Sequence, residues 1–142
     1  MSQTLFKKQA SLKEVSNIAK EILNSLPKDA IIFLNGDLAA GKTTLVSNIA
    51  KVLNLSAVTS PTFSLQQIYE DKLFHYDFYR VDFNKILEIG LLEEFEKNGL
   101  HFVEWGSDEL KEILSKAGFN IYSITITATK DNLRRYKLEV LN

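Results

Sequence analysis

The sequence contains no cysteine, and only two prolines and two histidines occur among its 142 residues. The absence of cysteine excludes structural disulfides, thiolate metal sites and a cysteine nucleophile. His75 and His101 are too few imidazoles for a histidine-rich metal centre. Low-complexity tracts, internal repeats and Pro/Gly-rich linkers are also missing, so we expect one domain spanning residues 1–142.

The sequence also lacks an excess of charge of one sign and a long hydrophobic run. Its 17 basic and 18 acidic residues give a net charge of -1, which lowers the expectation of direct nucleic-acid binding but leaves room for a local basic patch. Residues 1–8 have no apolar core of the kind found in signal peptides, and the longest apolar runs are too short to span a membrane. We therefore expect a cytoplasmic protein without membrane association.

Hydrophobic spacing predicts an alternation of helices and strands. Ser11 and Glu14 form a capping-box pattern at the start of the first helix. The predicted helices cover 11–26, 42–53, 86–97 with a bend near Gly90, and 107–116. The predicted strands cover 30–34, 62–70, 73–79, 100–103, 122–128 and 136–141. Strands interleaved with helices predict an α/β fold of three layers, with a mixed, mainly parallel central sheet flanked by helices.

One motif, G-x-x-x-x-G-K-[ST], is matched in full, by Gly36, Asp37, Leu38, Ala39, Ala40, Gly41, Lys42 and Thr43. A buried strand is predicted directly before the motif and an amphipathic helix begins within it, which is the setting that a phosphate-binding loop requires. An ordinary glycine-containing turn is the alternative, and the complete match with its flanking elements argues against it. The sequence therefore predicts a P-loop NTPase-like fold.

The chemistry of such a loop follows from its backbone. Glycines let the chain fold round a phosphate, and successive N–H groups together with the positive end of the following helix attract the anion. Lys42 is expected to reach the β- and γ-phosphates, the Thr43 hydroxyl to bind Mg²⁺, and the Thr44 hydroxyl to meet the α-phosphate. Residues 36–44 are the candidate binding residues for ATP or ADP.

Acidic residues end two of the predicted strands. Glu104 follows the apolar run 100–103, and Asp77 occupies the corresponding position near the end of 73–79. Either carboxylate could hold the water shell of a bound Mg²⁺ while the other positions the attacking water. Each could also be a solvent-exposed acid at a strand end. For Trp105, a packing role is favoured over a base-stacking role, because tryptophan is generally well buried.

The motifs together resemble those of the TsaE family (also called YjeE), small bacterial ATPases of tRNA threonylcarbamoyladenosine biosynthesis. The resemblance extends over nearly the whole chain. It rests on residues 36–44, 60–63 (Ser-Pro-Thr-Phe), 75–80 (His-Tyr-Asp-Phe-Tyr-Arg) and 104–105 (Glu-Trp). The phosphate loop is common to many NTPases, whereas the other three elements in this order are specific.

The resemblance implies a protein that binds ATP with Mg²⁺ and hydrolyses it slowly when alone. It implies association with the TsaB–TsaD pair, which transfers the threonylcarbamoyl group to an adenosine of the tRNA anticodon loop, so that tRNA is met only through the complex. ATP hydrolysis would reset that complex. Thr43 and Glu104 would be the metal-side residues, Lys42, Glu104 and Asp77 the catalytic ones, and Ser60 with Thr62 part of a switch-like loop.

Some positions depart from the family pattern or have a second interpretation. The family usually has glycine where this chain has Ala39, and residues 45–49 lack the basic residue often found there. Ser60 and Thr62 also fit a plain loop before a strand. Arg80 fits either an internal charge stabiliser or a surface arginine.

Two other functions stay open at this point, a small-molecule kinase and a nucleotide-binding module without catalysis. Against the kinase, the sequence shows no long arginine-rich lid, and its one close arginine pair is Arg134 and Arg135 near the C-terminus. The sequence also has no clear guanine-recognition motif, so the choice of ATP over GTP rests on the resemblance.

Overall fold

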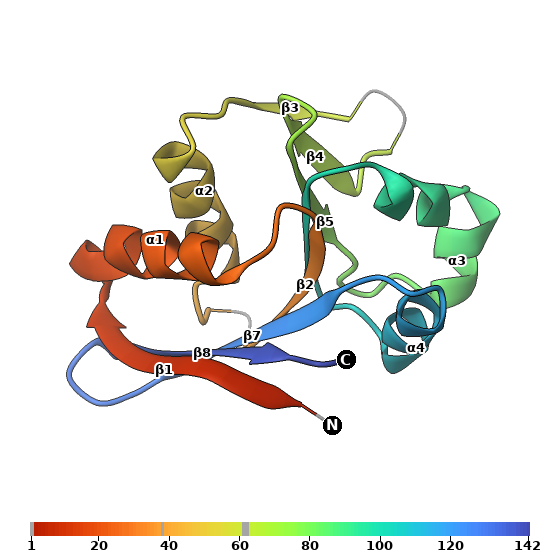
Figure 1. Ribbon diagram of the computed structural model, residues 1–142. Coiled ribbons are helices and arrows are strands. Elements are labelled where there is room, and N and C mark those ends of the chain that lie inside the picture. Colours follow the sequence, from red (N-terminus) through yellow and green to blue (C-terminus); the bar gives the residue numbers. More distant parts are fainter. Residues whose placement is uncertain (1, 38, 61–62) are drawn as a thin grey trace.

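The computed structural model describes residues 2–37, 39–60 and 63–142, and within these ranges eight strands form one sheet with helices on both faces (Figure 1). The strands are β1 (Gln3–Ser11), β2 (Ala30–Asn35), β3 (Ala57–Thr59), β4 (Gln66–Tyr69), β5 (Leu73–Asp77), β6 (Leu100–Glu104), β7 (Ile121–Ala128) and β8 (Leu133–Val140). The helices are α1 (Val15–Ser25), α2 (Lys42–Val52), α3 (Phe83–Glu88) and α4 (Asp108–Lys116), with 3₁₀ turns η1 (Leu12–Glu14) and η2 (Leu91–Glu96).

The sheet has a parallel centre and antiparallel wings. Its strand order is β1-β8-β7-β2-β6-β5-β4-β3. The pairs β7–β2, β2–β6 and β6–β5 are parallel, and the other four described pairs are antiparallel. The prediction of a mixed sheet is confirmed, but "mainly parallel" is wrong. The reason is that β1 and β3, which hydrophobic spacing did not predict, each add an antiparallel pair at one edge.

Side chains of the central strands alternate between two cores, one on each face. On β2, Ile32 and Leu34 pack with the buried residues of α1 and α2, whereas Ile31 and Phe33 pack with those of α3, η2 and α4. Figure 1 shows the same division, with α1 and α2 on one side of the sheet and α3 and α4 on the other. Helices therefore cover both faces of the sheet, as a strand buried on both faces requires, and the predicted three layers are present.

The predicted helices are found with adjusted ends. The first opens with η1 and continues as α1, and the backbone N–H of Ser11 donates to the Glu14 carboxylate at 3.0 Å, as the capping box predicts. The helix expected over 86–97 is divided at Gly90, whose φ of 76° is left-handed, into α3 and η2. None of the helices in the described ranges is both long and apolar enough to cross a membrane.

The parallel centre sets the position of the candidate site. In parallel strands the carboxyl ends meet at the same edge of the sheet, and ligands of open α/β sheets bind there. β2 ends directly before the loop at 36–41, while β5 ends at Asp77 and β6 at Glu104. Glu104 pairs in register with Leu34 on one side and with Asp77 on the other. The loop and both acids therefore lie at one edge.

Candidate functional site

The backbone of the loop between β2 and α2 depends on its two glycines. Gly36 has a φ of 151°, and a Cβ there would lie 2.7 Å from the Ile126 carbonyl oxygen and 2.9 Å from the Ala40 Cβ. Gly41, the residue before α2, has a φ of 103°. L side chains rarely adopt either angle, so both positions favour glycine. Leu38, one of the predicted binding residues, lies outside the described ranges.

Lys42 is buried and turned back over this loop. Its side chain is 3% exposed, and its Nζ donates to the backbone oxygens of Gly36 at 2.5 Å and Asp37 at 3.2 Å. The same Nζ lies 3.9 Å from the centre of the Trp105 ring, within the range of a cation–π contact. Its positive charge is therefore fixed between the loop and the residue that follows Glu104.

Thr43, Glu104 and His75, which lie on α2, β6 and β5, form a hydrogen-bonded chain. The Thr43 Oγ1 donates to Glu104 Oε2 at 2.8 Å, and the His75 Nε2 donates to the same oxygen at 2.5 Å. Burial acts to raise the pKa of Glu104, but the hydrogen bonds from His75 and Thr43 and the charges of His75 and Lys42 outweigh it and lower that pKa. Glu104, only 4% exposed, is therefore an ionised carboxylate in a buried place.

His75 is a site residue to which the sequence analysis gave no role. It is 7% exposed and lies two positions before Asp77 on β5, and both residues line the same hollow. Since side chains two apart on a strand lie on one face, the spacing from Asp77 was a signal that could have identified it.

The hollow beside these residues brings Asp77 to the site. It has a volume of about 470 Å³ and is lined by Thr43, His75, Asp77 and Glu104 among others. Asp77 is exposed, and its Oδ1 accepts from the Tyr79 backbone N–H at 3.0 Å. The two predicted acids are thus in different settings, because Glu104 is buried and hydrogen-bonded to Thr43 while Asp77 faces solvent.

A second hollow, of about 250 Å³, lies on the loop side of the Thr43–Glu104 contact. It is lined by Leu12, Ala39, Gly41, Lys42, Thr43, Thr44, Glu104 and Arg134. Thr43 and Glu104 line both hollows. A hydroxyl and an ionised carboxylate are the hard oxygen donors that Mg²⁺ takes, commonly with few protein ligands. The described residues hold no cluster of three or more His, Cys, Asp or Glu suited to a metal, so an ion here would need further ligands from substrate or water.

The other residues singled out in the sequence differ in how close they lie to this site. The Ser60 Oγ accepts from the Phe63 backbone N–H at 3.0 Å, and Ser60 is buried, whereas Thr62 lies outside the described ranges. Arg80 is exposed and lies 5.1 Å from the centre of the Tyr79 ring. Trp105 is 37% exposed and joins the site through Lys42.

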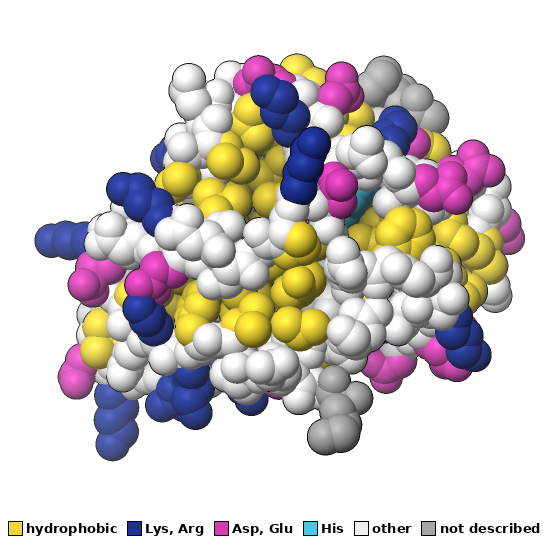
Figure 2. Space-filling model, viewed as in Figure 1, with side chains coloured by type: hydrophobic (Ala, Val, Ile, Leu, Met, Phe, Trp, Pro, Cys, Tyr) yellow, Lys and Arg dark blue, Asp and Glu magenta, His cyan; other side chains and the backbone are white. Residues whose placement is uncertain are grey.

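A larger apolar hollow lies away from this site, between the C-terminal ends of α1 and α2. Figure 2 shows hydrophobic side chains gathered on the surface there. Its apolar lining includes Leu23, Leu26, Leu53 and Leu55. It contains none of the charged groups of the candidate site.

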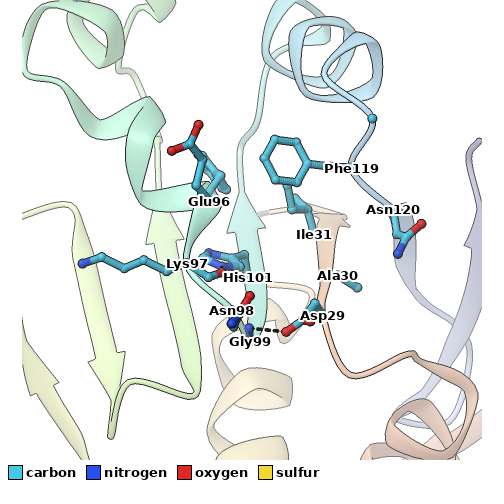
Figure 3. Close-up of a pocket in the computed structure, with 12 residues that line it drawn as sticks. Asp29, Ala30, Ile31, Glu96, Lys97, Asn98, Gly99, His101, Phe119 and Asn120 are labelled. Atoms are coloured by element: carbon cyan, nitrogen blue, oxygen red, sulfur yellow. Dashed lines mark hydrogen bonds between the residues drawn. The ribbon is translucent and has the colours of Figure 1, made fainter.

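A smaller hollow lies at the amino-terminal ends of β2 and β6, at the opposite edge of the sheet (Figure 3). Asp29 accepts from the Gly99 backbone N–H at 2.7 Å. His101 donates from Nε2 to the Lys97 carbonyl and accepts at Nδ1 from the Tyr76 hydroxyl, both at 2.7 Å. Burial lowers the pKa of His101, which keeps it neutral. With both ring nitrogens bonded inside the protein, His101 has a structural role.

Comparisons with known proteins agree with one another. A sequence model of the family described as "Threonylcarbamoyl adenosine biosynthesis protein TsaE" matches residues 9–136. The chain is 39% identical over 111 residues to the tRNA threonylcarbamoyladenosine biosynthesis protein TsaE of Rickettsia prowazekii, covering 74% of this chain and 76% of that protein. Its identity to the TsaE of Bacillus subtilis is 33% over 128 residues, with coverages of 82% and 80%. A crystal structure of YdiB from Bacillus subtilis aligns with a TM-score of 0.70 and 26% identity, over 100% of this chain and 88% of that one.

Proposed function

Since this chain belongs to the TsaE family, which takes part in tRNA threonylcarbamoyladenosine biosynthesis, we propose that it binds ATP and ADP with Mg²⁺ at residues 36–44 and hydrolyses ATP slowly. A P-loop NTPase-like fold is part of this proposal. It is supported by the succession of strand β2, the loop at 36–41 and helix α2. The loop lies at the carboxyl edge of the parallel strands, in a sheet that helices cover on both faces.

The observation that carries the proposal is the 2.8 Å hydrogen bond between Thr43 and Glu104. It joins the hydroxyl of the phosphate-loop motif to a buried, ionised carboxylate at the end of the neighbouring strand. That pairing is the arrangement in which P-loop NTPases hold Mg²⁺. A bound Mg²⁺ would neutralise the charge that develops on the phosphate oxygens. Thr43 and Glu104 are the residues that would hold it.

The remaining side chains have separate roles in the proposal. Lys42, with its charge fixed beside the loop, exchanges its contacts to the Gly36 and Asp37 carbonyls for phosphate oxygens. His75 keeps Glu104 oriented and ionised. Asp77, exposed in the adjoining hollow, accepts a hydrogen bond from the attacking water and orients it.

The action on the TsaB–TsaD pair rests on family membership. It is tested by following threonylcarbamoyl transfer to tRNA over many turnovers, with TsaB and TsaD, in the presence and absence of this protein. The chain offers a matched pair of variants, because Thr43→Ser keeps the hydroxyl and Thr43→Val keeps only the shape. Wild type and Thr43→Ser should sustain turnover, whereas Thr43→Val should not. Full multi-turnover yield without this protein would refute the proposal.

Phosphate release from ATP separates the ATPase from the kinase. Release without any added acceptor is expected. A strict requirement for a small-molecule acceptor would instead identify a kinase.

A further inference from the structure

One side chain from the far end of the sequence bonds to the outside of the phosphate loop. Arg134, on β8, donates from Nε to the Ala40 carbonyl oxygen at 2.7 Å and from Nη2 to the Ala39 carbonyl oxygen at 3.3 Å. The guanidinium is a rigid planar fork, so two adjacent donors can meet two successive carbonyls at once. Ala40 itself is 4% exposed, which makes its carbonyl a group that needs a partner.

The contact continues at Gly41. A Cβ at this glycine would lie 3.5 Å from Arg134 Nε and 3.7 Å from Arg134 Cδ, so the arginine packs directly against the residue that precedes α2. Arg134 also lines the hollow that contains Lys42 and Thr43. It is thus in contact with the half of the loop that follows Leu38 and precedes Lys42.

Holding these carbonyls also fixes the amides of the loop. The peptide bond is planar and trans, so the carbonyl of one residue and the N–H of the next point in opposite directions from one rigid plane. A hydrogen bond to the Ala40 oxygen therefore sets the direction of the Gly41 N–H, and one to the Ala39 oxygen sets that of the Ala40 N–H. The Ala40 N–H accordingly meets the Asp37 oxygen at 2.9 Å, which closes the loop.

We propose that Arg134 is a positioning residue that holds the phosphate loop in its nucleotide-binding shape from β8; the nucleotide part of this rests on the proposed function above. Its guanidinium binds the Ala39 and Ala40 carbonyls from outside the loop, so that the Gly41 N–H is oriented before any phosphate arrives, while the Ala40 N–H closes the loop on the Asp37 oxygen. A loop that already has its binding conformation binds nucleotide more tightly, because less conformational entropy is lost on binding.

The neighbouring Arg135 supplies a matched control. Successive side chains on a strand point to opposite faces, and Arg135 is exposed while Arg134 is partly buried. Arg134→Gln and Arg135→Gln therefore remove the same charge from adjacent positions of one strand. Arg134→Lys keeps the charge but has no fork to serve two carbonyls.

The experiment has one arm without nucleotide and one with it. Hydrogen exchange of the backbone amides at 36–44, measured without nucleotide, should be faster in Arg134→Gln than in wild type and unchanged in Arg135→Gln. Calorimetric affinity for MgADP should fall about tenfold or more in Arg134→Gln, as expected for losing charge-assisted hydrogen bonds, and should stay at the wild-type value in Arg135→Gln. Arg134→Lys should lie between the two.

The outcomes distinguish this inference from the proposed function. If wild type binds no MgADP, the proposed function fails, and the exchange arm still decides whether Arg134 orders the loop. If Arg134→Gln matches Arg135→Gln in exchange and affinity, the positioning role is wrong. Wild-type exchange and affinity in Arg134→Lys would show that the positive charge alone matters and not the two hydrogen bonds. Faster exchange in Arg134→Gln throughout β7 and β8 would show that Arg134 stabilises the sheet and not the loop. Either result overturns the proposal.

Discussion

Replacing Gly36 by alanine tests whether steric contact dictates the shape of the loop between β2 and α2. The new Cβ would lie 2.7 Å from the Ile126 carbonyl oxygen and 2.9 Å from the Ala40 Cβ, and real Cβ atoms do not approach other atoms so closely. The nearest atoms belong to the backbone of β7 and to a side chain with no rotamer to change. The φ of 151° is a second obstacle for an L residue.

The magnitude follows from these two terms. An unfavourable positive φ costs a non-glycine residue about 1–2 kcal/mol, and overpacking a fixed site costs about 1–3 kcal/mol. Gly36→Ala should therefore lower the free energy of unfolding by about 2–5 kcal/mol. Gly118→Ala is the control, because Gly118 has a φ of 93° but nothing within 4 Å of its added Cβ. Gly118→Ala should lose only the free energy that the positive φ costs, about 1–2 kcal/mol.

Urea unfolding of the two variants and wild type measures the difference. A loss in Gly36→Ala that is no greater than the loss in Gly118→Ala would refute the argument, because the close approach to Ile126 would then carry no energetic weight. Equal denaturant slopes in the three proteins are needed for the comparison.

Three further predictions concern single side chains. The folded-state pKa of Glu104 lies below its ordinary value of 4.5, so the ionised carboxylate stabilises the fold above pH 4.5, and this stabilisation is lost as the pH falls through the lowered pKa. The free energy of unfolding of Glu104→Gln should therefore fall less than that of wild type on acidification. Equal losses, measured by urea unfolding, would contradict this. The Ser107 Oγ accepts from the Leu110 N–H at the start of α4, so Ser107→Ala should cost about 1 kcal/mol of stability with unchanged MgADP affinity in calorimetry. Trp105, the sole tryptophan, lies 3.9 Å from Lys42 Nζ, so MgADP should change its fluorescence, and unaltered emission at saturation would refute that placement.

Elements with a local sequence signal were predictable. The run 30–34 is apolar throughout and becomes β2, which is buried on both faces, and the motif that follows it indicates α2 without any tertiary information. Glu104 and Asp77 could be placed at one edge because each ends an apolar strand and parallel strands end together.

The two missed strands are held by pairing more than by their own hydrophobicity. β1 is exposed at most positions, with Lys7 and Lys8 in its middle, and its register shifts between Thr4 and Phe6, so no alternation marks it. It is a strand because it pairs with β8 along its length. β3 has only three residues and pairs with β4. Sequence spacing cannot reveal such elements, since their partners lie elsewhere in the chain.

The site shows the same limit. Thr43 and Glu104 were both predicted, but their direct hydrogen bond depends on β2 and β6 being neighbours, because the two residues are 61 positions apart in the sequence. Arg134 was noted only as one of a pair of arginines. Its targets are backbone carbonyls, which every residue has, so the Ala39 and Ala40 sequence contains no sign of the contact.

The central claim, nucleotide binding at residues 36–44, is tested most directly by calorimetric titration of MgADP into wild type, Lys42→Ala and Lys51→Ala. Lys42 and Lys51 both lie on α2, but Lys42 is buried against the loop and Lys51 is exposed at the other end of the helix. Wild type and Lys51→Ala should bind alike and Lys42→Ala should show no binding, with unchanged circular dichroism in all three. Equal affinity of Lys42→Ala and wild type would contradict the account.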